Sequence, residues 1–144
     1  MSKEEKLEKI RHSLAHVLAM AVLEKFPGSK LAIGPVIENG FYYDFDDLKI
    51  AEEDLPMLEK RMRELIEAKI EFEKEEVGEE EAKKLFQNQP YKLELIEELK
   101  KAGEKISIYR SGDLTDLCRG PHVDNTEEID PDAFKLTQIA GAYW

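Results

Sequence analysis

The chain has 144 residues, enough for one globular domain that buries about two-thirds of the surface its unfolded form exposes. Its net charge of −11, from 32 acidic and 21 basic residues, opposes the attraction by which free nucleic-acid-binding proteins hold phosphates. No apolar run approaches the roughly 18 residues of a membrane span, and residues 1–5 lack the apolar core of a signal peptide. We therefore expect a cytoplasmic protein without membrane contact. Any role with nucleic acid would depend on a local pocket, on neighbouring domains or on delivery by another protein.

The beginning of the chain predicts one long helix over residues 5–26. Apolar residues recur there at three- and four-residue steps, and Pro27-Gly28 ends the pattern. Few charges interrupt any face of this helix between His12 and Phe26. Such a helix is usually buried on most sides.

A β-hairpin is predicted next, from residues 30–37 and 40–45. Both segments are rich in β-formers and aromatic residues, and Asn39-Gly40 favours a tight turn between them. In a regular strand Tyr42 and Tyr43 point to opposite faces, so one of them belongs to the core.

The middle of the chain predicts a surface helix over residues 53–69 and a half-buried strand over 70–77. The helix has an apolar stripe of Leu58, Met62, Leu65 and Ile66 opposite a charged face of Glu59, Lys60, Arg63 and Glu67.

The remaining elements are two short helices, at 79–87 and 93–101, and three strands, at 105–110, 114–118 and 133–139. Helices and strands do not alternate regularly, which favours an α+β fold. We expect an antiparallel β-sheet wrapped around the long buried N-terminal helix, with additional surface helices, in a single domain spanning 1–144.

Three histidines and one cysteine form two pairs with the same spacing. His12 and His16 lie one helical turn apart on the same face, while Cys118 and His122 are separated by Arg119-Gly120-Pro121, which favours a strand followed by a turn. A single cysteine excludes an internal disulfide. The two pairs are predicted to converge on one site.

Two chemistries suit these four residues. Imidazole and thiolate groups are ordinary zinc ligands, and zinc lowers the pKa of bound water. Histidine also titrates near neutral pH and can act as a general base without a metal. Spacing alone does not choose between them.

Three further candidate residues lie elsewhere along the chain. Asp116 shares a strand face with Cys118, Lys92 stands at a helix start, where a positive charge opposes the helix dipole, and Gly34 interrupts a strand where a ligand could approach closely.

Four ordered blocks resemble the second N-terminal domain of bacterial threonyl-tRNA synthetases. These blocks are residues 12–16 (HSLAH), 32–44 (AIGPVIENGFYYD), 116–123 (DLCRGPHV) and 140–144 (AGAYW). The same histidine and cysteine pairs occur in alanyl-tRNA editing domains, which are similar in fold and often bind zinc. The second block favours the threonyl-tRNA synthetase branch, and the resemblance to this branch implies a site that works without a metal.

The resemblance implies post-transfer editing: hydrolysis of the ester that joins serine to the 3′-terminal adenosine of threonine tRNA. It implies that His12 activates or places the attacking water and that Lys92 orients this water or stabilises developing charge. It further implies that His16, Asp116, Cys118 and His122 line the pocket, with Asp116 suited to the substrate amino group and Tyr43 and Gly34 near the serine and adenosine.

Three functional hypotheses remain open. The first is a metal-independent seryl-tRNA deacylase, in which no cofactor is required. The second is a zinc-dependent deacylase of the alanyl type, with His12, His16, Cys118 and His122 as ligands. The third is a module that binds the aminoacyl-tRNA 3′ end without hydrolysing it. The chain is expected to be either a fragment that works with other synthetase domains or a freestanding editor.

Overall fold

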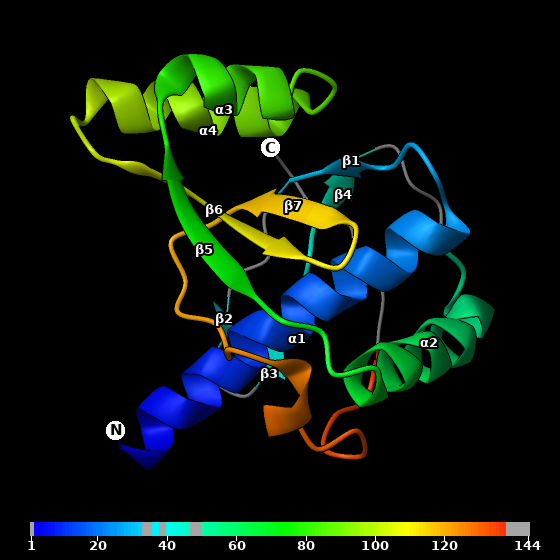
Figure 1. Ribbon diagram of the computed structural model, residues 1–144. Coiled ribbons are helices and arrows are strands. Elements are labelled where there is room, and N and C mark those ends of the chain that lie inside the picture. Colours follow the sequence, from blue (N-terminus) through cyan, green and yellow to red (C-terminus); the bar gives the residue numbers. More distant parts are fainter. Residues whose placement is uncertain (1, 33–35, 38–39, 47–49, 138–144) are drawn as a thin grey trace.

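The computed structural model describes residues 2–32, 36–37, 40–46 and 50–137, and these residues form an α+β fold (Figure 1). The helices are α1 (Lys3–Lys25), α2 (Leu55–Glu67), α3 (Glu79–Leu85) and α4 (Pro90–Lys101), with short 3-10 turns η1 (Glu52–Asp54) and η2 (Thr126–Glu128). The strands are β1 (Lys30–Leu31), β2 (Val36–Ile37), β3 (Gly40–Phe41), β4 (Phe45–Asp46), β5 (Glu73–Val77), β6 (Ile106–Ser111) and β7 (Leu114–Leu117). Among the residues described, no helix is long and apolar enough to cross a membrane.

The predicted long N-terminal helix is confirmed as α1, and it is the centre of the main core. It begins earlier than expected because the Ser2 hydroxyl accepts the Glu5 N–H at 3.1 Å and caps the helix. Nearly every residue from Ser13 to Val22 is buried, as the absence of charge on any face predicted. Helix α2 and strands β2 and β3 contact α1.

Strands β5, β6 and β7 form one antiparallel sheet in that order, between α1 and the α3–α4 pair (Figure 1). Successive side chains of β6 point to opposite faces of the sheet, which explains why the sheet packs against helices on both sides. Ile106 and Ile108 pack with Ala82 and Ile96 of the two helices, whereas Tyr109 belongs to the core around α1. The sheet therefore carries a small second core on its other face.

The predicted hairpin is confirmed as two short antiparallel ladders. Strand β1 pairs with β4, β2 pairs with β3, and the Ala32 N–H donates to the Asp44 carbonyl at 2.9 Å. Tyr43 is buried while Tyr42 is exposed, so the expected division between the two tyrosines holds. Gly34 and Asn39 lie outside the described residues.

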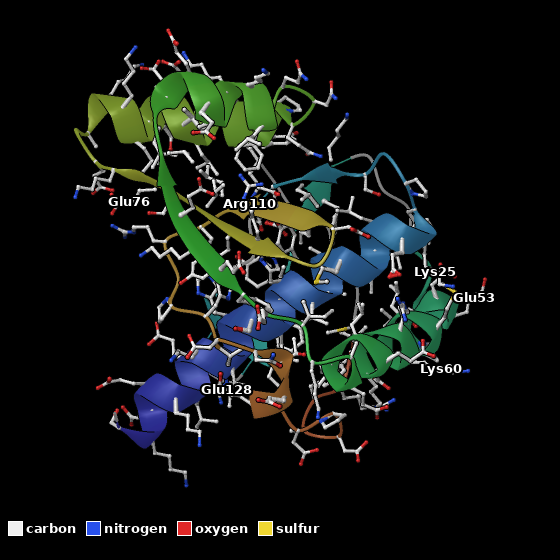
Figure 2. The ribbon with its side chains drawn as sticks, in the orientation of Figure 1. Lys25, Glu53, Lys60, Glu76, Arg110 and Glu128 are labelled. Carbon is white, nitrogen blue, oxygen red and sulfur yellow. The ribbon has the colours of Figure 1, made fainter. Side chains whose placement is uncertain are left out.

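The apolar stripe of α2 is buried as predicted, but one residue of its charged face was placed wrongly. Glu59 is only 8% exposed. Its Oε1 accepts the Leu136 N–H at 2.8 Å, and its Oε2 accepts a hydrogen bond from Arg63 at 3.2 Å. Lys60, the next residue along the helix, points outward as expected (Figure 2).

Several other boundaries differ from the predictions, including that of β5, which begins at Glu73 rather than at residue 70. Helix α4 begins at Pro90 rather than at residue 93, because proline fits the first helical position, where no N–H is required. The prediction of a strand over 133–139 is wrong for residues 133–137, which form no strand. The Leu136 N–H donates to the Glu59 side chain instead of to a neighbouring strand.

Candidate functional site

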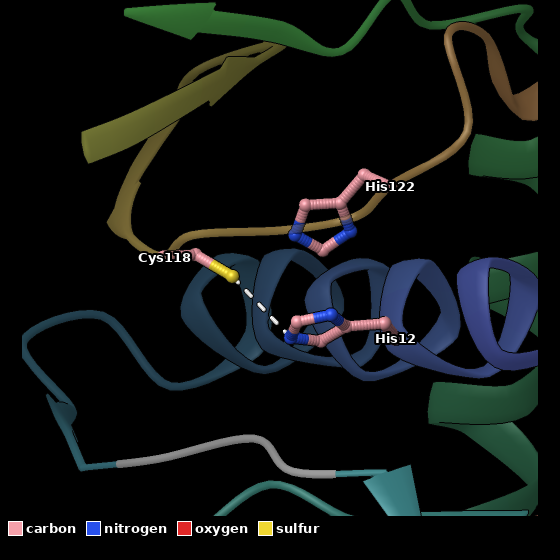
Figure 3. A group of neighbouring side chains, drawn as sticks. All are labelled: His12, Cys118 and His122. Carbon is pink, nitrogen blue, oxygen red and sulfur yellow. Dashed lines mark hydrogen bonds between the residues drawn. The ribbon is translucent and has the colours of Figure 1, made fainter. Parts of the chain in front are cut away.

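The two predicted pairs meet where α1 passes beneath the segment that follows β7 (Figure 3). The Cys118 Sγ lies 3.3 Å from the His12 Nε2, and one ring nitrogen of His122 completes a group whose ligand atoms are all within 4.8 Å of one another. His12 and Cys118 are half-buried and His122 is buried. The part of this group nearest to solvent is therefore His12 with Cys118.

The turn after β7 is held by local backbone bonds. The Cys118 N–H donates to the Ser107 carbonyl at 3.1 Å, and the Gly120 N–H donates to the Cys118 Sγ at 3.3 Å. Gly120 has φ of +83°, and a Cβ at this position would collide with the Tyr109 hydroxyl. A glycine is therefore required to bring Cys118 and His122 to the same side of the turn.

The His122 ring is surrounded by aromatic side chains and one hydroxyl. Tyr109 meets it edge-on at a centroid distance of 4.4 Å, and Phe72 lies at 5.0 Å. The His122 Nδ1 is 3.1 Å from the Ser13 Oγ, while its Nε2 is buried without a hydrogen-bond partner among the described residues.

A second polar group lies deeper, around Asp116. Its Oδ1 accepts hydrogen bonds from the Lys92 Nζ and the Leu117 N–H, both at 2.8 Å. Its Oδ2 accepts the Tyr43 hydroxyl at 2.8 Å and lies 3.8 Å from the His16 Nδ1. Lys92 is only 2% exposed, so this is a fully buried ion pair.

Burial sets the protonation of the histidines. It lowers the pKa of His12, although a backbone hydrogen bond to Pro121 opposes the shift. It lowers the pKa of His16 to about 4 against the attraction of Asp116, and that of His122 to about 2. All three imidazoles are therefore neutral at pH 7, and His12 keeps an unprotonated nitrogen that can accept a proton.

The two acidic groups of the site differ in charge at neutral pH. Burial raises the pKa of Cys118 to about 11, so this side chain is a neutral thiol rather than a nucleophilic thiolate. Burial would also raise the pKa of Asp116, but the charge of Lys92 and hydrogen bonds from Lys92 and Tyr43 bring it below its ordinary value. Asp116 is therefore an ionised carboxylate.

The structure brings together every candidate residue that lies within its described part. These residues are His12, His16, Tyr43, Lys92, Asp116, Cys118 and His122. Sequence reasoning missed Ser13, although its place between His12 and His16 could have suggested it. It also missed Tyr109, whose role depends on the contact with Gly120 and His122 and left no signal in the sequence.

The donor set His12, Cys118 and His122 fits zinc in type and nearly in spacing. Ligand atoms of a tetrahedral zinc site are about 3.4 to 3.6 Å apart, given Zn–N of about 2.0 and Zn–S of about 2.3 Å. The His12–Cys118 distance of 3.3 Å agrees, and because all ligand atoms lie within 4.8 Å of one another, no pair would have to approach by more than about 1.4 Å. His16 is not part of this group, because its Nδ1 faces Asp116.

Comparison with known proteins identifies relatives over the whole chain. Residues 106–141 match the family described as the threonyl and alanyl tRNA synthetase second additional domain. The chain is 56% identical to threonine–tRNA ligase of Borrelia turicatae over 145 aligned residues, covering 100% of this chain and 25% of the relative. It is 54% identical to the ligase of Dehalococcoides mccartyi, covering 96% of this chain and 23% of the relative. The chain thus spans about a quarter of the length of these relatives and is related to the N-terminal region of bacterial threonine–tRNA ligases.

Proposed function

We propose that the chain is a single tRNA-editing domain that hydrolyses the ester of serine on threonine tRNA, with water activated by His12. The observation that carries the proposal is a neutral, half-exposed imidazole beside a neutral thiol and a second imidazole, in a chain related to threonine–tRNA ligases. The activity would be a carboxylic ester hydrolase working within a threonine–tRNA ligase.

The chemistry of the amino acids explains why such a step is needed. Serine lacks one methyl group of threonine, and one methyl changes binding in a pocket by about 1 to 3 kcal/mol. This difference is too small for accurate aminoacylation. A second site that hydrolyses the smaller ester and excludes the extra methyl supplies the missing discrimination.

The proposed reaction assigns the proton transfer to His12. Its unprotonated nitrogen accepts a proton from water while the water oxygen attacks the ester carbonyl carbon. The bond from this carbon to the adenosine oxygen then breaks, and that oxygen takes up the proton held by His12. Free serine and the tRNA 3′ end are the products. Cys118 serves as a small polar wall, because a neutral thiol does not act as the nucleophile.

Asp116 and Lys92 support the site through their charges. The Asp116 Oδ1 already accepts two hydrogen bonds, whereas its Oδ2 accepts one, from Tyr43, so Oδ2 keeps an acceptor site for a substrate amino group. The buried Lys92 ammonium remains a fixed positive charge that can stabilise the developing oxyanion. Gly34 and Tyr43 are proposed, by resemblance, to lie near the adenosine and the serine.

The test is release of serine from threonine tRNA mischarged with serine. His12→Ala is expected to slow release by about 10²- to 10⁴-fold, the usual effect of losing a general base. Lys6→Ala, an exposed change on the same helix, serves as control and should not alter the rate. Absence of release by the wild type, or an undiminished rate in His12→Ala, would refute the proposal. Binding of a non-hydrolysable seryl-adenosine analogue without turnover would instead indicate a binding module.

A zinc-dependent deacylase is the second candidate, favoured by the clustering of the three potential ligands. When bound, zinc would supply an acidified water, and His12, Cys118 and His122 would hold the ion. Metal analysis of protein purified without chelator separates the two functions. Stoichiometric zinc that disappears in Cys118→Ser would favour this candidate, whereas full activity in metal-free protein would exclude it.

A further inference from the structure

Ser13 joins α1 to the segment that carries His122. It is fully buried between His12 and His16 in the sequence. Its Oγ accepts the Val123 N–H at 2.9 Å and lies 3.1 Å from the His122 Nδ1. A single hydroxyl therefore contacts both the backbone next to His122 and the ring itself.

The partners available to the hydroxyl hydrogen indicate the direction of the second bond. A hydroxyl carries one hydrogen, and a backbone N–H can only donate, so the bond with Val123 leaves the Ser13 hydrogen free. In the described part of the chain, the His122 Nδ1 is the one other hydrogen-bond partner of this hydroxyl. A neutral imidazole that accepts at Nδ1 carries its proton on Nε2.

We propose that Ser13 is a positioning residue that holds His122 with its proton on Nε2, directed at the space between His12 and Cys118. Figure 3 shows the His122 ring turned toward these two side chains. The Nε2 is buried without a partner among the described residues, and an unpartnered buried donor is costly. A substrate oxygen or a water between the three side chains would satisfy it.

This assignment gives the site two different imidazoles. His12 accepts a proton, while His122 donates a hydrogen bond from Nε2. The consequence for catalysis rests on the proposed deacylase function, in which this donor would stabilise the oxyanion or orient the attacking water. The assignment also bears on metal binding, because Nε2 can ligate zinc only if the Ser13 bond reverses and the proton moves to Nδ1.

The direct test is the tautomer of His122 in the wild-type chain. The chain, labelled with ¹⁵N in histidine and freed of metal by chelator, is studied by long-range ¹H–¹⁵N NMR at pH 8, with His12→Gln and His16→Gln used to assign the three rings. The expected spectrum has His122 protonated on Nε2 alone. Protonation on Nδ1, or a mixture of tautomers, would overturn the proposal.

Two serine variants then test whether Ser13 is the cause. Ser13→Ala should convert His122 to a mixture of tautomers and slow serine release by at least tenfold, and Ser13→Cys, which keeps a weak donor, should partly restore both. Ser111→Ala is the matched control, because this buried hydroxyl donates its hydrogen bond to the Met20 sulfur of α1 rather than to a histidine. A folded Ser13→Ala with an unchanged tautomer would contradict the assignment. An Nε2 proton in a chain that releases no serine would refute only the deacylase function.

Discussion

Two neighbouring polar groups in this molecule differ in their access to solvent. The group around Asp116 is fully buried, and its carboxylate accepts hydrogen bonds from Lys92, Tyr43 and the Leu117 backbone. The group of His12, Cys118 and His122 is nearer to solvent, because His12 and Cys118 are only half-buried. Each group contains one buried ring nitrogen without a partner among the described residues, the Nε2 of His16 in the first and that of His122 in the second. A buried ion pair is costly to break, whereas a half-buried group can be reached by a ligand. We expect the first group to dominate stability and the second to dominate chemistry.

The largest expected effect on stability comes from breaking the buried ion pair. Lys92→Met leaves Asp116 as an uncompensated buried charge and should lower the free energy of unfolding by about 3 to 5 kcal/mol. The measurement is denaturant unfolding at pH 7. Lys83→Met is the matched control, because Lys83 also pairs with two carboxylates but on the surface, and it should change stability little. Equal losses in both variants would contradict the burial of the Lys92–Asp116 ion pair.

The pH dependence of stability provides the next test. His16 has its pKa lowered by burial from 6.5 to about 4, so the unfolded chain binds a proton more readily than the folded chain. The contribution of neutral His16 to the free energy of unfolding is complete above about pH 6.5. As the pH falls toward 4, up to about 3 kcal/mol of this contribution is lost. Asp116, whose pKa is also lowered, adds a loss only below its ordinary value of 3.8. Unfolding curves from pH 7 to 4 should be flatter for His16→Gln than for His12→Gln, and identical slopes would argue against the burial of His16.

A smaller effect is expected from the turn between Cys118 and His122. Gly120→Ala combines an unfavourable positive φ with a collision against Tyr109 and should cost at least about 2 kcal/mol. Gly103→Ala, at φ of +70° with no atom near its Cβ position, isolates the backbone cost of about 1 kcal/mol. Thermal unfolding of both variants measures the difference. Equal stability of Gly120→Ala and Gly103→Ala would argue against the close contact between Tyr109 and Gly120.

The smallest expected effect is on the rate at which the Cys118 thiol is alkylated. Because burial raises the pKa of its thiol to about 11, iodoacetamide should react slowly at pH 8 and faster as the pH rises. The same chain unfolded in urea is the reference, with a rate profile centred near the ordinary thiol pKa of 9.0. Rapid alkylation of the folded chain at pH 8 would show that Cys118 is a reactive thiolate.

Several features of this protein were determined by the sequence itself, because they depend on neighbours within one helical turn or one strand. The apolar content of residues 13–22 predicted the buried helix α1, and the four-residue spacing placed His12 and His16 on one face of it. Asn39-Gly40 predicted the hairpin that pairs β2 with β3. The convergence of the two pairs is not local, and it was predicted because the three histidines and the single cysteine of the chain all fall into these two pairs.

Only the tertiary structure decided which partner each polar group has. Glu59 lies on the face of α2 that was predicted to be exposed, yet it is buried. Its carboxylate accepts the N–H of Leu136, 77 positions away. Asp116 forms its ion pair with Lys92 because β7 and α4 are brought together by the sheet, and Ser13 reaches His122 across 109 positions. Local patterns carry no information about such pairings, since a buried donor or acceptor is satisfied by whichever group the fold delivers to it.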